Sequence, residues 1–311
     1  MDLILTVTVN PAIDKTISAD RLVFEDRSYI LSTTEAAGGR GLNAAQVLHS
    51  FGANTLAIAP SGGEAGEQLR AFLSGNLYPF ELVPIARGIR NNLIITDKQG
   101  LTVKLNEPGA ELSPEELSRV EKAVCNHLDN AAWLLLCGSL PPGVSSDFYR
   151  GLIRSAKKRG VKTLVDTDAE VLQDALLDGP TVITPNQQEA SRLLNKGLIT
   201  KQHIRNAATR LLGMGSQYVL LSLGGRGAIG AREGQIIEAV PPNVDAVCPI
   251  GAGDAFNAAF VWAMSLNNDF ADAVRWAVAA GTASAILPGM QFADLEQSRA
   301  IYHRVEVREL R

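Results

Sequence analysis

The sequence predicts an α/β protein with a mostly parallel central sheet and a small β-rich addition. Short apolar runs recur along the 311 residues and alternate with segments that carry helix signals. Several runs consist almost wholly of Val, Ile and Leu, which is typical of parallel strands covered by helices on both faces. Strands that alternate with helices indicate βαβ units. The expected strands are Leu3–Val9, Asn54–Ala59, Ala132–Cys137, Lys162–Asp166, Thr181–Thr184 and Tyr218–Leu223.

Helix signals separate these strands. Ser113-Pro114-Glu115-Glu116 places an N-cap, a proline at N1 and a glutamate at N3 before a helix that runs to about Leu128. A segment from Ser146 to Arg159 stops before Gly160, a residue that favours a helix end. Thr200 is expected to cap a helix that runs through Leu212.

Two regions favour strand without helix, and they predict a β-rich lid. They run from about 15 to 36 and from about 80 to 106, and the second contains Asp97-Lys98-Gln99-Gly100, a turn-like tetrapeptide. We expect one domain over residues 1–311, with the lid inserted into the α/β body. Mobile covers over active sites are often built this way, although an ordinary surface hairpin fits the same pattern.

Composition excludes several classes of protein. The net charge of −4 shows no basic excess, so a nucleic-acid partner is not expected. No apolar run approaches the roughly 18 residues of a membrane span, and no basic stretch precedes the first apolar run as in a signal peptide. Cys125, Cys137 and Cys248 lack metal-ligand spacing. We expect a cytoplasmic protein without a structural zinc site.

A glycine-rich segment, Gly38-Gly39-Arg40-Gly41-Leu42-Asn43, precedes an apolar helical run. Glycines let a ligand approach the backbone closely, and the start of the next helix offers unpaired N–H donors. Asn43 lies in the first turn, where its amide could bond a hydroxyl-rich ligand. A purely structural turn explains the same glycines, so both interpretations stay open.

A second segment, Gly251-Ala252-Gly253-Asp254, enters another apolar helix. Successive N–H groups at a helix start attract anions. Asp254 brings a negative charge into this place, either to support the first helical turn or as a general base beside a bound phosphate. With an ordinary pKa near ~3.9 its carboxylate would be ionised at neutral pH without special tuning.

A third segment contains a GxGxxG pattern at Gly225, Gly227 and Gly230, and Asp245 follows at the spacing of a dinucleotide fingerprint. That fingerprint needs a helix after the glycines, whereas the segments on either side of Glu233-Gly234 are expected to form a β-hairpin. An NAD site is therefore not expected. No Walker A sequence occurs in the chain.

Two further segments follow predicted strands, where α/β proteins place ligands. Gly138–Gly143 forms a Gly- and Pro-rich loop after the strand that ends at Cys137. Asn186 and Glu189 open a helix after the strand Thr181–Thr184. An Asn-x-x-Glu on one helical face could hold a hydrated Mg²⁺ or form an ordinary helix start.

Taken together and in this order, the segments resemble the ribokinase-like (PfkB) family of carbohydrate kinases. Gly38–Asn43 is similar to the family's N-terminal signature, Asn186–Glu189 to its NxxE motif and Gly251–Asp254 to its GAGD signature. The resemblance implies a three-layer α/β/α ribokinase-like fold with a β lid. Within the family the chain most resembles sugar-phosphate kinases, especially ribokinase-type 6-phosphofructokinases.

The resemblance also implies roles for individual residues. It makes Asp254 the catalytic base, next to an anion site formed by the amides of Gly251, Ala252 and Gly253. It implies that the sugar phosphate contacts Asp14, Arg27, Gly38, Gly39, Arg40, Asn43, Arg90 and Ser139. It implies that ATP contacts Asn186, Ser222, Gly224, Gly225 and Gly227. It implies that Asn186 and Glu189 lie near Mg²⁺ and hold it through water.

Two departures from the family pattern bear on substrate and cation. Arg40 occupies a position that is Lys in fructose-1-phosphate and tagatose-6-phosphate kinases and Gly in ribokinase-type 6-phosphofructokinases. Its guanidinium could join a phosphate clamp or point to solvent. Cys248-Pro249-Ile250 replaces the Asp-Thr-Thr of many relatives, so a monovalent-cation dependence is not carried over.

The functional hypothesis is transfer of the ATP γ-phosphoryl group to a phosphorylated ketohexose, with fructose 6-phosphate as the first candidate. Fructose 1-phosphate and tagatose 6-phosphate are the alternatives. A kinase for unphosphorylated sugars or nucleosides, a non-catalytic sugar-phosphate or nucleotide sensor and an NAD dehydrogenase are the rival classes. A homodimer through the lid is expected from the resemblance, and an unpaired β edge gives it a physical motive.

Overall fold

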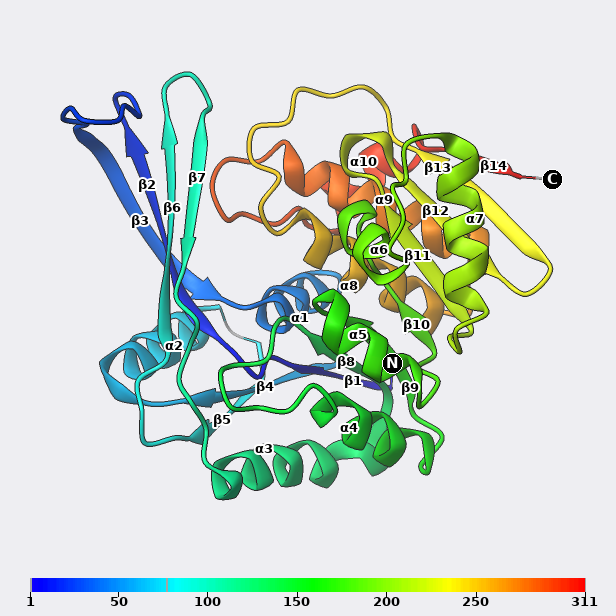
Figure 1. The fold of residues 1–311 in the computed structure, drawn as a ribbon, viewed down its shortest axis with the longest axis horizontal. Coiled ribbons are helices and arrows are strands. Elements are labelled where there is room, and N and C mark those ends of the chain that lie inside the picture. The colour runs from blue at the N-terminus through cyan, green and yellow to red at the C-terminus, as the bar shows by residue number, and fades with distance from the viewer. Residues whose placement is uncertain (1, 77, 311) are drawn as a thin grey trace.

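The computed structural model describes residues 2–76 and 78–310, which form a large sheet, a small sheet and the helices around them (Figure 1). The large sheet has the order β14-β13-β12-β11-β10-β9-β8-β1-β4-β5. Neighbouring strands are parallel from β5 to β11, and β12 to β14 are added antiparallel. Its strands are β1 (Leu3–Val7), β4 (Thr55–Ser61), β5 (Phe80–Pro84), β8 (Ala131–Cys137), β9 (Lys162–Asp166), β10 (Val182–Ile183), β11 (Tyr218–Ser222), β12 (Ala228–Arg232), β13 (Gln235–Val240) and β14 (Glu306–Glu309).

Helices cover both faces of this sheet, which confirms the three-layer α/β/α arrangement. Successive strand residues point to opposite faces, so Leu5 packs in one core cluster and Ile4 in the other. The Leu5 cluster is covered by α2 (Gly63–Gly75), α3 (Pro114–His127), α4 (Phe148–Lys157), α5 (Ala169–Leu176), α6 (Gln187–Leu193) and α7 (Lys201–Leu212). The Ile4 cluster is covered by α1 (Arg40–Ser50), α8 (Ala252–Ser265), α9 (Phe270–Ala285) and α10 (Leu295–Tyr302).

The predicted helix starts are formed by the expected caps. Ser113 Oγ accepts a hydrogen bond from the Glu116 amide at 3.2 Å, and the Glu116 carboxylate accepts one from the Ser113 amide at 2.8 Å. Thr200 caps α7 through one hydrogen bond only, accepted by its side chain from the amide of His203. The helix predicted from Ser146 begins two residues later, at Phe148. No helix of the described residues is both long and apolar enough to cross a membrane.

The small sheet is the lid, and it projects from the body at the upper left of Figure 1. Its order is β3-β2-β6-β7, and its strands are β2 (Ala12–Ala19), β3 (Ile30–Gly38), β6 (Arg90–Asp97) and β7 (Thr102–Asn106). The predicted second lid segment began at Phe80, which is wrong. Phe80–Pro84 pairs with β4 in the large sheet, so the lid resumes only at Arg90.

The two faces of the lid sheet differ in polarity. Paired residues in neighbouring strands share a face, so Asp14, Asn92 and Asn106 lie on one face. The opposite face carries apolar residues such as Leu105, paired with Leu93. Leu105 is 52% exposed and Leu31, from β3, is 51% exposed. The polar face borders the body, whereas the opposite face is exposed at Leu31 and Leu105 and meets α2 near Glu35, which accepts a hydrogen bond from Gln68.

The glycine pattern after β11 lies in a β-hairpin, as expected. β12 and β13 pair antiparallel on either side of Glu233-Gly234. A short 3₁₀ turn, Gly224–Arg226, precedes β12. The helix that an NAD fingerprint requires is therefore replaced by a strand.

Candidate active site

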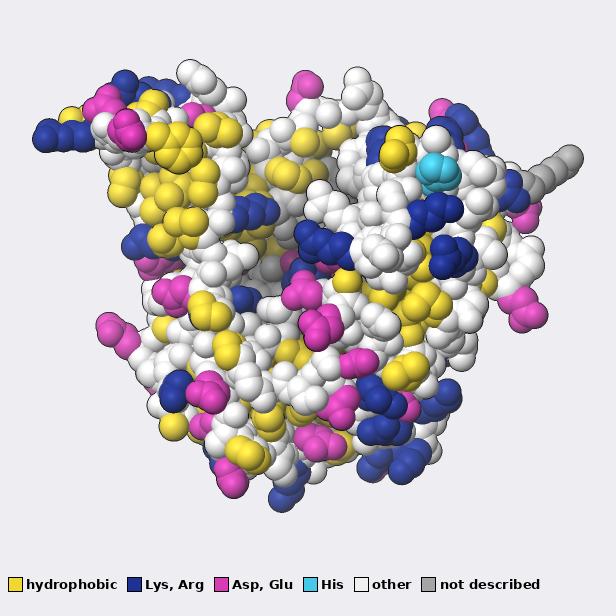
Figure 2. Space-filling view, viewed as in Figure 1, with side chains coloured by type: hydrophobic (Ala, Val, Ile, Leu, Met, Phe, Trp, Pro, Cys, Tyr) yellow, Lys and Arg dark blue, Asp and Glu magenta, His cyan; other side chains and the backbone are white. Residues whose placement is uncertain are grey.

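The carboxyl ends of β1, β8, β9, β10 and β11 meet at one edge of the sheet, and three cavities follow one another along it. The lid cavity, about 320 Å³, lies between the lid and the body and contains Asp14, Arg90 and Ser139. The central cavity, about 140 Å³, contains Asp166, Asn186 and Glu189. The hairpin cavity, about 370 Å³, begins at Ser222 and Gly224. Figure 2 shows the hollow beside the lid, with Lys and Arg side chains at its mouth.

Asp254 lies in the first turn of α8 and lines both the lid cavity and the central cavity. It is 7% exposed, and its Oδ2 accepts a hydrogen bond from Asn43 Nδ2 at 2.7 Å. Burial, with the charge of Asp166 as a smaller cause, raises the pKa of Asp254 to about 7, and the Asn43 bond opposes this rise. The expectation of an untuned carboxylate is therefore wrong, because the sequence did not show how deeply the side chain is buried.

Backbone geometry at the start of α8 favours a bound anion. Gly251 caps the helix at φ 79°, and a Cβ there would lie 2.6 Å from the ring of Phe292. The Ala252 amide donates to the Pro249 carbonyl at 3.3 Å. The amides of Gly251 and Gly253 have no partner among the described residues, so two of the three predicted donors are free to bind an anion.

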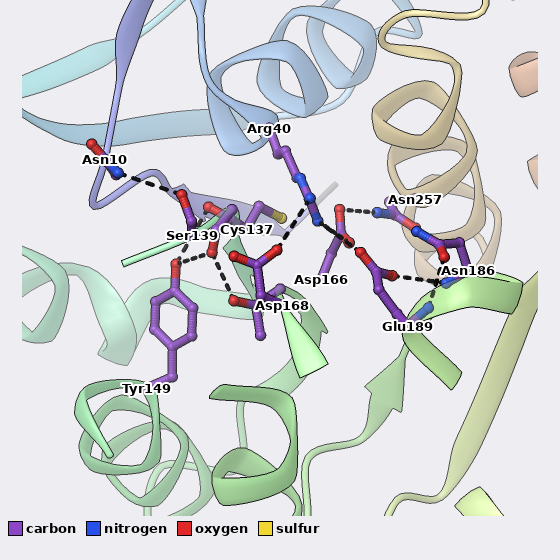
Figure 3. Close-up of polar contacts among 12 residues, drawn as sticks. Asn10, Arg40, Cys137, Ser139, Tyr149, Asp166, Asp168, Asn186, Glu189 and Asn257 are labelled. Atoms are coloured by element: carbon purple, nitrogen blue, oxygen red, sulfur yellow. Dashed lines mark hydrogen bonds and ion pairs between the residues drawn. The ribbon is translucent and has the colours of Figure 1, made fainter. Parts of the chain in front are cut away.

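Arg40, the first residue of α1, reaches into a group of carboxylates (Figure 3). Its Nη1 lies 2.9 Å from Asp166 Oδ1 and 3.8 Å from Glu189 Oε1. Its Nη2 lies 3.7 Å from Asp168 Oδ1. The other oxygen of Asp166 accepts a hydrogen bond from Asn257 Nδ2 at 2.9 Å. Arg40 therefore points into the site rather than to solvent.

Asn186 and Glu189 form a capping box at the start of α6, which is the structural alternative left open above. Asn186 Oδ1 accepts hydrogen bonds from the amides of Gln188 and Glu189, each at 2.9 Å. Glu189 Oε2 accepts one from the Asn186 amide at 2.8 Å. The remaining oxygen, Oε1, faces Arg40. One carboxylate thus caps a helix and still presents an oxygen to the central cavity.

The central cavity fits a hydrated cation better than a directly bound one. Thr184 Oγ1 and Asn257 Oδ1 line it, and both are buried without a hydrogen-bond partner among the described residues. Within the same residues no three His, Cys, Asp or Glu side chains are placed to bind a metal ion together. Two carboxylates and two neutral oxygens match the ligands that Mg²⁺ takes alongside water.

The lid cavity brings together most of the predicted sugar-phosphate residues. Asn92 Nδ2 donates to Asp14 Oδ1 at 2.7 Å, and burial raises the pKa of Asp14. Arg90 donates to the backbone carbonyls of Glu107 and Asn10 at 3.0 and 3.1 Å, which fixes its guanidinium. Gly38 lies directly against Asp14, since a Cβ there would approach that carboxylate to 2.4 Å.

Gly39 and Ser139 also line the lid cavity, and Arg27 does not. Gly39 has φ 135°, and a Cβ there would lie 2.6 Å from Thr8 Cγ2. Ser139 Oγ lies 3.4 Å from Asn10 Nδ2. Arg27 lies in the exposed turn between β2 and β3, where its amide donates to Asp26 at 2.7 Å. Within one protomer Arg27 is not brought to this site.

The hairpin cavity contains four of the five residues predicted for ATP, whereas Asn186 lines the central cavity instead. Ser222, Gly224, Gly225 and Gly227 line it together with apolar side chains such as Val278. Ser222, Gly253 and Phe256 also line the central cavity, so the two spaces are adjacent. Small-molecule pockets are lined mainly by apolar groups with a few polar ones, and this lining is of that kind.

Sequence reasoning missed several polar residues of the site. Asp166 ends the predicted strand Lys162–Asp166 and Asp168 follows it, so the strand-end rule applied to Asn186 would have found them. Lys104 and Asn106 line the lid cavity from the edge strand β7. An exposed lysine on an edge strand normally indicates protection against aggregation, so its pattern gave no functional signal.

Comparison with known proteins agrees with this geometry. The profile described as "pfkB family carbohydrate kinase" matches residues 7–297. The chain is 32% identical to the ATP-dependent 6-phosphofructokinase isozyme 2 of Escherichia coli, over 96% of this chain and 97% of that one. It is 25% identical to a tagatose-6-phosphate kinase of Staphylococcus epidermidis, over 99% and 100%. The crystal structure of phosphofructokinase-2 from Escherichia coli with fructose-6-phosphate superposes with a TM-score of 0.90 at 31% identity, covering 97% of this chain and 99% of that one. The chain therefore belongs to the pfkB family of carbohydrate kinases, ATP-dependent phosphotransferases that act on a hydroxyl group.

Proposed function

We propose that the protein transfers the γ-phosphoryl group of ATP to fructose 6-phosphate and forms fructose 1,6-bisphosphate. One observation carries the proposal. Asp254 lies at a helix N-terminus and faces both a polar cavity under the lid and the cavities that lead to the glycine-lined pocket. A base at that point can reach an acceptor hydroxyl while free amides face the transferred group.

In the proposed step, the acceptor hydroxyl oxygen attacks the γ-phosphorus in line with the leaving oxygen of ADP. The new P–O bond forms as the bond to ADP breaks, and the hydroxyl proton passes to Asp254. The amides of Gly251 and Gly253 stabilise charge on the phosphoryl oxygens. Burial raises the pKa of Asp254 to about 7 in the free protein, so the ionised form that accepts the proton becomes dominant as pH rises through about 7.

Cationic side chains in the lid cavity support a substrate that already carries phosphate. Arg90, Lys104 and Arg40 all line it. Arg90 is held by two backbone carbonyls, and its Nε is buried with no partner among the described residues. A guanidinium fixed in this way suits a phosphate dianion and would orient the sugar. Asp14 and Asn43 are then the proposed partners of sugar hydroxyls.

We propose that ATP lies in the hairpin cavity with its phosphates toward Gly253. Glu189 and Asn186 would hold Mg²⁺ in the central cavity, largely through water. When bound, the ion would neutralise charge on the phosphate oxygens. The two buried oxygens without partners, Thr184 Oγ1 and Asn257 Oδ1, support this assignment.

A substrate panel with MgATP tests the proposal. Fructose 6-phosphate, fructose 1-phosphate, tagatose 6-phosphate and unphosphorylated fructose are compared by ADP release. We expect the highest kcat/KM with fructose 6-phosphate and little turnover of fructose. Preference for another ketohexose phosphate would correct the substrate and keep the reaction. Absence of ADP with every sugar phosphate would favour a non-catalytic sensor.

We also propose a homodimer that covers the apolar face of the lid. Leu31 and Leu105 are about half exposed there, and a sheet with one bare apolar face gains from a second copy. Light scattering should show a dimer for the wild type and a monomer for Leu105→Asp. Ile199→Asp, at a site that is 83% exposed outside the lid, is the matched control and should stay dimeric. If all three proteins have the same mass, the lid does not form a dimer interface.

A reducing, cytoplasmic setting completes the proposal. Cys125, Cys137 and Cys248 are all free thiols, and Cys137 is buried in the core. Unpaired cysteines are typical of proteins in reducing compartments.

A further inference from the structure

Arg40 occupies the boundary between two of the three cavities. Arg40 and Asp254 are the two side chains that line both the lid cavity and the central cavity. A phosphoryl group that moves from a nucleotide on one side to a sugar on the other must cross this boundary. The two side chains at the crossing are therefore one carboxylate and one guanidinium.

One hydrogen bond holds the Arg40 guanidinium in place and leaves its other N–H donors without a partner among the described residues. Among the described residues, Arg40 makes one side-chain hydrogen bond, from Nη1 to Asp166 Oδ1 at 2.9 Å. Its contacts with Asp168 and Glu189, at 3.7 and 3.8 Å, are beyond hydrogen-bond length. Asn257 holds the second oxygen of Asp166, so the anchor itself is fixed. A guanidinium has five N–H donors, and those left over are available to a ligand.

The charge of Arg40 is secured at the same time. Asp166 is the main cause that raises the pKa of Arg40, and burial acts in the opposite direction. The side chain stays protonated throughout the working pH range. A permanent cation thus faces the place where Asp254 and phosphate oxygens bring negative charge together.

Two other roles for Arg40 make different predictions. As a clamp for the phosphate already on the sugar, Arg40 would duplicate Arg90, and its loss would raise KM. As a purely structural ion pair, it would act through folding and stability alone. A contact with the group in transit strengthens only in the transition state, so its loss lowers kcat.

We propose that Arg40 is a catalytic residue that donates hydrogen bonds to the γ-phosphoryl group as it crosses from nucleotide to sugar, with Asp166 as the residue that positions it. This inference rests on the proposed function and deepens it. It assigns the transferred group a side-chain donor in addition to the backbone amides of Gly251 and Gly253.

The test compares Arg40→Ala and Arg40→Lys with Arg150→Ala. Arg150, on α4, is the matched control, because it lines none of the three cavities. Its Nε lies 2.6 Å from Asp178 Oδ2, so it too belongs to an ion pair. We expect Arg40→Ala to lower kcat by about a hundredfold, the usual cost of one transition-state donor, with both KM values within about threefold. Arg40→Lys keeps the charge without the fork and should lose about tenfold. Arg150→Ala should keep the wild-type kcat.

A binding measurement separates catalysis from ground-state binding. Calorimetry uses ADP alone, and ADP with aluminium fluoride and fructose 6-phosphate as a mimic of the group in transit. We expect Arg40→Ala to weaken binding of the mimic by about the factor lost in kcat and to leave ADP affinity unchanged.

Each possible result either supports the role of Arg40 or overturns it. A kcat within threefold of wild type, or a loss confined to the KM of the sugar phosphate, overturns the inference. So does equal weakening of ADP and of the mimic. If Arg40→Ala does not fold, Arg40→Lys and its mimic affinity decide in the same way. If the wild type turns over no sugar phosphate, the proposed function fails first and this inference falls with it. If the wild type is active and both variants match it, only this inference fails.

Discussion

The body and the lid each hold an aspartate by the same bond, and the two aspartates differ in what surrounds them. Asn43 Nδ2 donates to Asp254 in the body and Asn92 Nδ2 donates to Asp14 in the lid, both at 2.7 Å. The two carboxylates are 7% and 8% exposed. Asp254 faces another carboxylate, Asp166, which adds to the effect of burial and raises its pKa to about 7.

The charged groups that act on the lid aspartate are cations, whereas Asp254 has both the Asp166 carboxylate and the Arg40 guanidinium nearby. Burial raises the pKa of Asp14, whereas Asn92, Arg90 and Lys104 all act to lower it. Equal bonds and equal burial thus leave one carboxylate suited to accept a proton and the other suited to hold a ligand. Burial is the largest cause of the raised pKa in both aspartates, and the neighbouring charges then separate the two.

Removal of the two charges, one at a time, gives the largest test of this contrast. Asp254→Asn should lose at least about a hundredfold in kcat, because it removes the general base. Asp14→Asn should raise the KM of the sugar phosphate about tenfold or more with kcat nearly kept, because it removes a charged hydrogen-bond partner. Steady-state kinetics with both substrates varied separates the two patterns, and identical patterns would abolish the distinction.

Thermal unfolding supplies a control for Asp254→Asn. The folded protein holds the Asp254 proton more tightly than the unfolded chain does, since the pKa rises from 3.8 to about 7. The stability linked to this group is therefore present at low pH and is lost as pH rises through about 7. Asp254→Asn should melt above the wild type at pH 8 and lose that advantage near pH 4.

Removal of the two asparagines gives a smaller and sharper test. The Asn43 bond favours the ionised form of Asp254, so Asn43→Ala should raise the pKa of that carboxyl further. The acid limb of the kcat/KM profile should then move up by about one pH unit, in line with the strength of a charge-assisted bond. Asn92→Ala, the matched control in the lid, should raise the KM of the sugar phosphate and leave the limb in place. A limb that moves equally in both variants would contradict the assignment of Asp254 as the titrating base.

Strand positions in the body follow from the sequence, but sheet membership does not. Lys162–Asp166 is found at its predicted bounds because a run this short, which begins just after the helix-ending Gly160, favours a buried strand over a helix. Phe80–Pro84 also has a strand pattern and was assigned to the lid. Its pairing with β4 depends on contacts distant in sequence, which local pattern does not encode.

The same limit applies to the site: residues in local motifs could be predicted, and their long-range partners could not. Asp254 and Asn186 stand in recognisable motifs, and their place at helix starts could be predicted. The partners that set their properties could not. Asn43 meets Asp254 across 211 positions of the chain, and Arg40 meets Asp166 across 126. Such pairs are fixed by the order of strands in the sheet, so their electrostatics become visible only in three dimensions.

The two carboxylate oxygens of Glu189 have different partners, and this affects the local opening of α6. One oxygen closes the first turn of α6, and the other faces the central cavity. A cation bound near Oε1 also changes the hydrogen bond between Oε2 and the Asn186 amide, because both oxygens belong to one carboxylate. Binding in the central cavity therefore alters the first turn of α6. Amide protons at the beginning of α6 would then exchange with solvent at a rate that follows the ligand, which makes this turn a natural reporter of loading.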